Sequence, residues 1–401
     1  MTAHATCLGC GLACDDIDVV VENGAITEAR NACALGVRWF GDGRVPTRAA
    51  DGAIDKAAAL LRGARRPLVY LAPDMANDTY GAATAVADVL HALVDTVTTV
   101  GPPGAGVLAG QVRGRTTSTF AEIRNRADLI VFWGVDPSVR YPRFQSRIAP
   151  GPAGMFLTGA RRVMAVDIGA AVGPADATER VAFTDEEEAA ALALVRAAVI
   201  GNAVPSSPLA TRATGLAKSL TAAKYVALVV DGEASAYQEA LLALSEAVNG
   251  PTRCGIAVLR AGGNRAGADS VLTWQTGYPM AVDFSRGVPR YVPLDGADRQ
   301  LARGEIDVVL VVGSSAGIPD AVRAHLGGTT CIVIGPRASE SAFPVAVALD
   351  TGIAGIHDGG AVVRADDMPL PLRASLPGVA PSASALVQAL LGALLAKVAT
   401  R

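Results

Sequence analysis

Short apolar runs alternate with helical patterns along most of the chain, and this alternation limits the folds that are available to it. The runs that predict strands lie at 67–72, 127–133, 163–167, 225–230, 255–259, 307–312 and 330–334. The helical patterns between them include 78–94, 184–200 and 239–248. Strands separated by helices form parallel sheets with right-handed crossovers. The sequence therefore predicts an α/β fold with two Rossmann-like parallel lobes.

The first 48 residues have a different texture. A β-branched run at 17–21 is followed by Asn23-Gly24 and by a return strand near 25–29. Asn-Gly between two such runs favours a hairpin, because both central residues of a type I′ turn need a positive φ. We therefore expect a small cysteine-rich β module at 1–48.

The length of 401 residues predicts two or three domains, at about 150 residues each. A Gly-, Pro- and Ser-rich break at 201–208 marks a boundary near residue 205. We expect a first α/β lobe at 49–205 and a second at 206–339. Residues 340–401, with a strand at 345–350 and a terminal helix after Pro381-Ser382, are candidates to complete the first lobe.

The composition excludes some classes of function. The net charge is −3, from 35 basic and 38 acidic residues that are well mixed, so no electropositive surface is expected to bind nucleic acid. No stretch reaches the roughly 18–20 apolar residues that span a bilayer, and 1–6 do not resemble an export signal. These features predict a cytoplasmic protein without a membrane segment. The longest apolar run, 385–399, is expected to be a helix docked on the core rather than one lying on a membrane.

Four of the six cysteines fall within the first 33 residues. Cys7, Cys10, Cys14 and Cys33 form a C-x2-C-x3-C loop and a fourth cysteine that a hairpin can return to it. A [4Fe-4S] cluster needs four converging thiolates, and this spacing suits it better than the paired knuckles of zinc sites. A metal centre is therefore predicted here, with zinc or an empty site left open. Cys254 and Cys331 lie in apolar strands and are expected to be core residues.

The segment Gly313–Gly317 leaves two alternatives open. Small residues after a strand would allow a phosphate to approach backbone N–H groups, but neither G-x-G-x-x-G nor Gly-Lys-Ser/Thr is present. The segment also matches G-x-S-x-G, which would make Ser315 a nucleophile if His325 or His357 lay beside it. A plain turn between strand and helix is the favoured interpretation.

Several unusual blocks of the sequence carry a resemblance to a known family. They are 7–17 with 31–36, then 122–137 with 142–147, and then 272–291, which contains Trp274-Gln275-Thr276-Gly277-Tyr278-Pro279. The chain resembles the B-type subunit of formylmethanofuran dehydrogenase, in the molybdopterin oxidoreductase superfamily, over nearly its whole length. The resemblance implies that superfamily's fold.

The chain departs from this family in the segment that corresponds to the family's metal-binding stretch. The family's active enzymes hold tungsten or molybdenum through a pterin dithiolene and a Cys or selenocysteine, with an adjacent His, in a Cys-His-Gly-Pro stretch. The corresponding segment here, 99–108, reads Thr-Val-Gly-Pro-Pro-Gly-Ala-Gly-Val-Leu and contains neither residue. Pro102 and Pro103 offer no metal-binding side-chain atom. Arg286 or Arg290 resembles an arginine near the family's active site, and its alternative role is in a buried ion pair. The cleft near these four residues is expected to be vestigial.

This departure matches related complexes of methylotrophic bacteria, which transfer formyl groups from tetrahydromethanopterin to a furan cofactor and release formate. The resemblance implies a non-catalytic scaffold subunit whose partners are formyltransferase, amidohydrolase-like hydrolase and C-type subunits, without a tungsten or molybdenum pterin. The alternative is an active formylmethanofuran dehydrogenase subunit that binds the pterin metal without a protein ligand. The four scattered histidines, His4, His91, His325 and His357, are too sparse to build a metal hydrolase centre.

Overall fold

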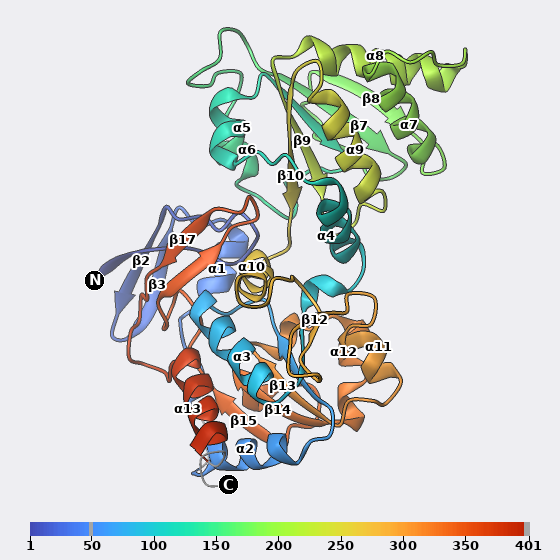
Figure 1. The fold of residues 1–401 in the computed structure, drawn as a ribbon. Helices are drawn as coiled ribbons and strands as arrows, with labels where there is room; N and C mark the ends of the chain where they lie inside the picture. Colours follow the sequence, from blue (N-terminus) through green and yellow to red (C-terminus); the bar gives the residue numbers. More distant parts are fainter. Residues whose placement is uncertain (48–50, 397–401) are drawn as a thin grey trace. The chain divides into compact units, whose positions relative to one another are not determined.

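The computed structural model describes residues 1–47 and 51–396, and this part of the chain divides into two compact units. Unit 1 takes in residues 1–47, 51–100, 262–364 and 369–396, and unit 2 takes in 101–261 and 365–368. Each unit contains a mainly or wholly parallel sheet with helices packed on it (Figure 1). The predicted α/β class is confirmed.

The large sheet of unit 1 is built from both ends of the chain. Its described strands run in the order β12-β11-β5-β4-β13-β14-β15. They are β4 (Pro67–Leu71), β5 (Leu93–Thr96), β11 (Val282–Asp283), β12 (Arg290–Tyr291), β13 (Val308–Val312), β14 (Thr330–Gly335) and β15 (Val347–Asp350). The five strands from β5 to β15 in this order are parallel, and β11 and β12 extend the edge in antiparallel fashion. Every residue of β4 and β13 is buried, as expected for central strands covered on both faces.

Helices cover both faces of this sheet. One core cluster joins it to α2 (Ala53–Gly63), α3 (Asn77–Val89), α10 (Arg265–Thr276) and α13 (Ala383–Ala396). A second cluster joins it to α11 (Ala297–Ala302) and α12 (Asp320–Arg323). The short 3-10 turns η1 (Val97–Thr99), η2 (Ser315–Gly317), η3 (Leu326–Gly328) and η4 (Ala338–Glu340) lie in the connections.

The predicted terminal helix is α13, and it packs on α2 and α3. Val387, Leu390 and Leu394 are fully buried in that contact, so this part of the helix is docked on the core as expected. Residues 397–399 of the predicted helix lie outside the described residues. Across the part of the chain that is described, no helix has the length and apolarity needed to cross a membrane.

Unit 2 has a wholly parallel sheet whose described strands run in the order β10-β9-β6-β7-β8. They are β6 (Leu129–Trp133), β7 (Arg162–Ile168), β8 (Glu179–Phe183), β9 (Tyr225–Asp231) and β10 (Arg253–Leu259). Its helices are α4 (Pro102–Arg113), α5 (Phe120–Arg126), α6 (Phe144–Ile148), α7 (Glu188–Val199), α8 (Pro208–Ala222) and α9 (Gln238–Val248). The predicted capping interaction before α7 is present, since the Glu187 N–H donates to Thr184 Oγ1 at 3.2 Å and the Thr184 N–H to Glu187 Oε2 at 3.0 Å.

The units do not follow the predicted lobes. The expected first lobe, 49–205, is split, because β4 and β5 pair within the sheet of β13–β15 whereas β6–β8 pair with β9. The break near residue 205 only connects α7 to α8 inside unit 2. Parallel strands pair across helical crossovers, so neighbours in sequence need not be neighbours in a sheet. The boundary predicted at 48–49 lies outside the described residues.

The helix predicted at 78–94 also ends earlier than expected. α3 stops at Val89, His91 adopts a φ of +50°, and Leu93 already begins β5. A left-handed residue just past a helix end stops the helix and redirects the chain. The apolar residues that extended the helical pattern instead form a buried strand.

The predicted N-terminal hairpin is confirmed. β2 (Ile17–Glu22) and β3 (Ala25–Arg30) are antiparallel, and Asn23 and Gly24 between them have φ of +50° and +73°. β1 (Thr2–Ala5) adds a third strand, and α1 (Ala34–Phe40) follows the hairpin. This module lies within unit 1, where a second hairpin of β16 (Gly360–Val363) and β17 (Pro369–Leu372) is beside it (Figure 1). Thr6 Oγ1 donates to the Pro371 carbonyl at 2.9 Å.

His357 also ties the C-terminal segment to this module. Its Nδ1 accepts from the Ile353 N–H at 2.9 Å, so Nε2 carries the proton and donates to the Gly43 carbonyl at 2.7 Å. Burial lowers the pKa of His357 from its ordinary value of 6.5. The neutral imidazole therefore bridges the two segments.

We expect His357→Gln to lower the free energy of unfolding by about 1–3 kcal/mol at pH 7.5, because two buried backbone groups lose a partner. In the wild type, only the unfolded chain gains a proton as the pH falls below 6.5, so stability decreases there. Denaturant unfolding from pH 7.5 to 5 should show this slope in the wild type and in the control His325→Gln, and a smaller slope in His357→Gln. An unchanged slope in His357→Gln would contradict the assignment.

Candidate functional site

The cysteine loop is held by its own backbone. The Cys7 N–H donates to the Cys14 carbonyl at 2.9 Å, and the Ala13 N–H donates to the Cys10 carbonyl at 3.2 Å. Ala13 has a φ of +39°, a left-handed conformation that closes the turn. The Gly9 N–H points at Cys7 Sγ, 3.3 Å away. Backbone N–H groups directed at sulfur are the usual outer contacts of a metal-bound thiolate.

The hairpin returns Cys33 to this loop, as the sequence predicts. Cys33 precedes the first residue of α1, and a Cβ on Gly36 of that helix would lie 3.3 Å from Cys7 Sγ. Glycine thus allows α1 to approach the loop. The other three cysteines all add to the rise in the pKa of Cys7, so the four thiols lie near one another.

Burial dominates the chemistry of these thiols. Cys7, Cys10 and Cys14 are buried, and no disulfide involves any of the four cysteines in the described residues. Burial raises the pKa of Cys7 to about 12 and that of Cys10 to about 11. The donor set suits a thiophilic metal, but among residues 1–47 and 51–396 no three Cys, His, Asp or Glu side chains are arranged to hold an ion. The structure therefore gathers the thiols without forming a coordination sphere.

A glycine pair holds the cysteine loop against the start of α10, a contact that sequence reasoning missed. The Gly263 N–H donates to the Leu8 carbonyl at 2.9 Å, and a Cβ on Gly262 would lie 2.9 Å from the Gly9 oxygen. The adjacent Asn264 is completely buried. Its side chain donates to the Met75 carbonyl at 2.9 Å and accepts from the Val363 N–H at 2.8 Å. The sequence Gly262-Gly263-Asn264 is the only local signal of this contact, and by itself it predicts no more than an ordinary turn.

The segment that resembles the family's metal-binding stretch follows β5. Asp269 of α10 accepts hydrogen bonds from Thr96 Oγ1 at 2.8 Å and Thr98 Oγ1 at 2.7 Å, and so fixes the chain before that segment. Pro102 and Pro103 then occupy the first two positions of α4, where a missing N–H has no cost. The segment thus serves as a helix start.

Asp95 lies beside Thr96 at the end of β5. Its carboxylate accepts from the Ala297 N–H at 2.7 Å, from the Thr96 N–H at 2.8 Å and from Thr99 Oγ1. Burial nevertheless raises the pKa of Asp95 to about 7. The three donors tie β5 to the start of α11.

The two arginines of the predicted cleft do not form the buried ion pair that was one alternative for them. Arg286 is exposed, Arg290 is half-buried in β12, and neither pairs with an acidic residue in the described part of the chain. They belong to unit 1, whereas Pro102 and Pro103 belong to unit 2. A vestigial cleft shared by these four residues remains a prediction.

Unit 2 has the topology of a ligand-binding sheet. Ligands of open parallel sheets bind at the carboxyl ends of the strands, where the strand order reverses. Here that point lies between β6 and β9, since β7 and β8 extend the sheet on one side and β10 on the other. Asp231 is the last residue of β9, and the loops after β6 and β9 contain Arg140 and Glu233.

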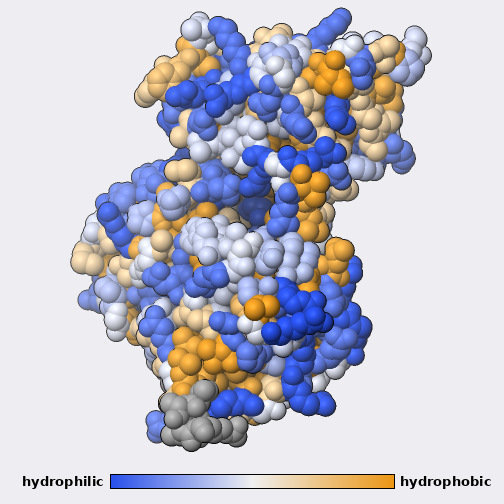
Figure 2. All heavy atoms as spheres, viewed as in Figure 1, coloured by the Kyte–Doolittle hydropathy of each residue, from blue (hydrophilic) through white to orange (hydrophobic). Residues whose placement is uncertain are grey.

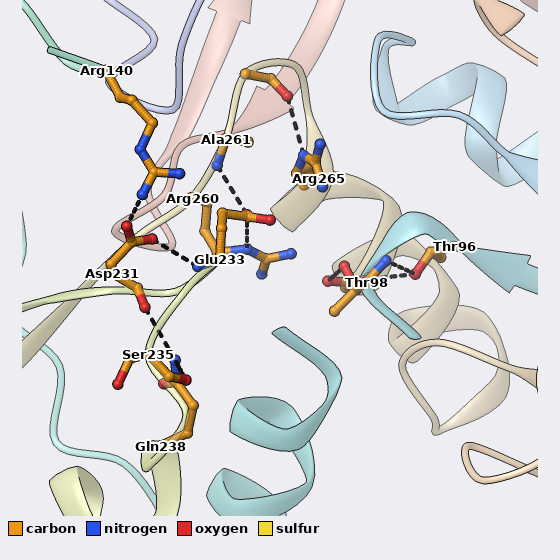
Figure 3. Close-up of polar contacts among 12 residues, drawn as sticks. Thr96, Thr98, Arg140, Asp231, Glu233, Ser235, Gln238, Arg260, Ala261 and Arg265 are labelled. Carbon is orange, nitrogen blue, oxygen red and sulfur yellow. Dashed lines mark hydrogen bonds and ion pairs between the residues drawn. The ribbon is translucent and has the colours of Figure 1, made fainter. Parts of the chain in front are cut away.

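Charged groups at this point are matched within the chain (Figure 3). Arg140 forms an ion pair with Asp231, whose side chain is only 9% exposed. Glu233 accepts from the Ala261 N–H at 3.0 Å and from Arg260 Nε at 3.4 Å. The loop after β9 is further held by Gln238, whose amide donates to the Asp231 carbonyl at 3.2 Å.

The carboxylate at the end of β7 is also occupied. In dinucleotide-binding sheets, an acid in this region typically bonds the ribose hydroxyls. Here both oxygens of Asp167 lie 2.6 Å from Arg180 Nη1, and one accepts from the Gly173 N–H at 2.8 Å. A nucleotide ribose would have to displace this contact.

The equivalent point of unit 1 lies between β4 and β13. There Asp74 Oδ1 accepts from the Ser314 N–H at 2.9 Å, so this N–H is already engaged by a carboxylate. The 313–317 segment forms a 3-10 turn, Ser315–Gly317, rather than a helix start. Both ring nitrogens of His357 are engaged elsewhere, as described above. These contacts favour the plain-turn interpretation of Gly313–Gly317.

Comparison with known proteins gives the chain its relatives, although no family model matches it. It is 28% identical over 404 residues to the B-type subunit of tungsten-containing formylmethanofuran dehydrogenase 2 from Methanococcus maripaludis, covering 92% of this chain and 93% of that protein. The protein of the same name from Methanocaldococcus jannaschii is 28% identical over 421 residues, with 92% of each covered.

A solved structure is also similar to most of this chain. It is a chain of the formyltransferase/hydrolase complex from Methylorubrum extorquens, determined with methylofuran. The TM-score is 0.73 at 27% identity, with 88% of this chain and 99% of that chain covered. The chain is therefore similar over nearly its whole length, in both sequence and fold, to B-type subunits of formylmethanofuran dehydrogenase and to a chain of the formyltransferase/hydrolase complex.

Proposed function

We propose that this chain is a non-catalytic scaffold subunit of a formyltransferase/hydrolase complex, which converts formyl-tetrahydromethanopterin to formate through a furan cofactor. Its partners in this proposal are formyltransferase, amidohydrolase-like hydrolase and C-type subunits. The observation that carries the proposal is the 99–108 segment, in which no side chain can replace the cysteine and histidine of the family's enzymes. The match to nearly all of a chain of such a complex supports the assembly.

The contacts of unit 2 support the loss of the pterin cofactor. The cofactor's phosphates and ribose would need donors and carboxylates at the carboxyl ends of the strands. Arg140, Arg180 and Arg260 instead engage the chain's own Asp231, Asp167 and Glu233. Opening these pairs would leave charges without partners in partly buried positions, which is costly. In the alternative function, an active oxidoreductase subunit, the bound pterin would have to supply new partners for these charges.

The first test compares the two functions in the intact complex, purified anaerobically through a tag on this chain. We expect co-purified formyltransferase and hydrolase subunits, release of formate from the formyl donor, and less than about one-tenth of an atom of tungsten or molybdenum per chain. Arg286→Lys and Arg290→Lys should leave the rate of formate release within about twofold of the wild type, because neither group contacts a reacting atom in this proposal. Stoichiometric tungsten or molybdenum together with formate-linked reduction of viologen would instead establish the oxidoreductase.

We also propose that Cys7, Cys10, Cys14 and Cys33 hold a metal centre, with a [4Fe-4S] cluster favoured over zinc by their spacing. Such a centre would stabilise the N-terminal module and, through Leu8 and Gly263, the start of α10. Small rotations of the thiol side chains would be needed to complete the coordination sphere.

The second test is elemental analysis of the same complex for iron, acid-labile sulfide and zinc. Either about four iron atoms or one zinc ion per chain is expected in the wild type. Cys10→Ser should reduce that content at least fivefold and lower the melting temperature, whereas the buried control Cys331→Ala should retain the metal. Loading the metal-free protein should release protons near pH 7, because the pKa values of Cys7 and Cys10 are about 12 and 11 and metals bind the thiolate. Wild-type complex with neither metal would refute this site.

A further inference from the structure

A groove on the surface of unit 2 has walls formed by two helices with matching apolar faces. It encloses about 720 Å³. The wall from α4 consists of Ala105, Leu108, Ala109 and Val112, and the wall from α7 consists of Ala189, Leu192, Ala193 and Arg196. Both sets repeat at i, i+3, i+4 and i+7, which places each on one helical face. Two stripes of this kind that line one groove can receive the apolar face of another helix.

Three alanines form part of the floor of the groove. α4 and α7 both pack against α9, and the lining contributed by α9 and the two residues before it contains Ala236, Ala240 and Ala243 together with Tyr237, Gln238 and Glu239. Alanine side chains allow a further helix to approach to the 8–10 Å that is typical between packed helix axes. Helix packing on this face of unit 2 therefore has room for one more member between α4 and α7.

Part of the apolar lining is open to solvent, since Ala105, Ala189 and Ala193 are exposed, whereas Ala109, Leu192 and Ala243 are buried. Val112 is 85% exposed, although it continues the apolar stripe of α4, and hydrophobic residues gather at the surface over α4 (Figure 2). Such an exposed apolar stripe is a common mark of a protein-interaction site. Notably, α4 is the helix that begins at Pro102 and Pro103, in the segment where the family's enzymes carry their metal ligands.

The charges at the groove indicate the kind of occupant. Arg113 is already paired with Glu239 at 3.0 Å and with Glu246 at 3.7 Å. No described residue pairs with the exposed guanidinium of Arg196, which stands at the end of the α7 stripe. A small-molecule site would bring several polar groups together inside the pocket, but here the charged groups other than Arg196 neutralise each other. An apolar protein segment with one acidic residue complements this lining.

We propose that the groove between α4 and α7 seats an amphipathic helix from another protein of the complex. The apolar face of that helix fills the alanine-lined floor with large aliphatic side chains, and an acidic residue reaches Arg196. The inference rests on the proposed function, since it assigns the surface that the scaffold uses to hold one of its partners. Helix-in-groove docking of this kind uses anchors at i, i+3, i+4 and i+7.

The test uses the complex purified through a tag on this chain. Ala193→Lys places a long charged side chain in the groove, and its matched control, Ala190→Lys, places the same side chain on an exposed position of α7 outside the groove. With Ala193→Lys or Arg196→Glu, recovery of at least one partner should fall about tenfold or more. Ala190→Lys should recover every partner as the wild type does. Circular dichroism melting of the free chain checks that both lysine variants fold alike.

A photo-crosslinking residue at Val112 identifies the occupant. The expected product joins this position to a helix of a partner protein that carries an acidic residue among aliphatic ones. Normal assembly of Ala193→Lys and Arg196→Glu, or crosslinks only to a second copy of this chain, would overturn the docking proposal while the scaffold function stands. If the wild-type chain recovers no formyltransferase or hydrolase at all, the scaffold function itself fails, and the docking proposal fails with it.

Discussion

The pairing of β4 with β13 is the interaction on which most of this structure depends. The two strands are buried throughout and parallel over their whole length, yet about 240 residues separate them, as Leu71 and Val312 do. Their pairing joins strands from the first hundred residues to strands from the last hundred and forty residues in one sheet. Most of unit 2, residues 101–261, is folded from the chain between them, and the short segment 365–368 joins it later, so the polypeptide leaves unit 1 and returns to it twice. Long-range parallel pairing of this kind is slow to form, because a long loop must close before its contacts are gained.

The charge pairs at the carboxyl ends of the sheet in unit 2 lie where open parallel sheets bind ligands. The strand order still makes a switch point, which is where such sheets bind ligands. Arg140 and Arg180 nevertheless engage Asp231 and Asp167 of the same chain. A fold is conserved more easily than a site, since the sheet needs only buried aliphatic residues while a site needs particular donors. The scaffold function that we propose keeps the first and dispenses with the second.

Some of the structure could be predicted because the signal is local. The hairpin at Asn23-Gly24, the capping pair Thr184 and Glu187 and the central strands follow from turn chemistry and short apolar runs. The proximity of Cys33 to Cys7 also follows, since the hairpin between them sets the return path of the chain. Asn264 and the Gly262-Gly263 pair escaped notice because their importance comes from Leu8, Met75 and Val363, which are remote in sequence.

The sequence alone determined the α/β class, the clustering of four thiols, the absence of cysteine and histidine from 99–108 and the resemblance to B-type subunits. The tertiary structure decided which strands share a sheet, and it replaced the predicted lobes 49–205 and 206–339 with units that exchange segments. It also decided that residues of α4 and α7 line the same groove of unit 2. The physical reason is that turns and periodicity are set by neighbouring residues, whereas strand partners and helix faces are set by packing among segments that are hundreds of residues apart.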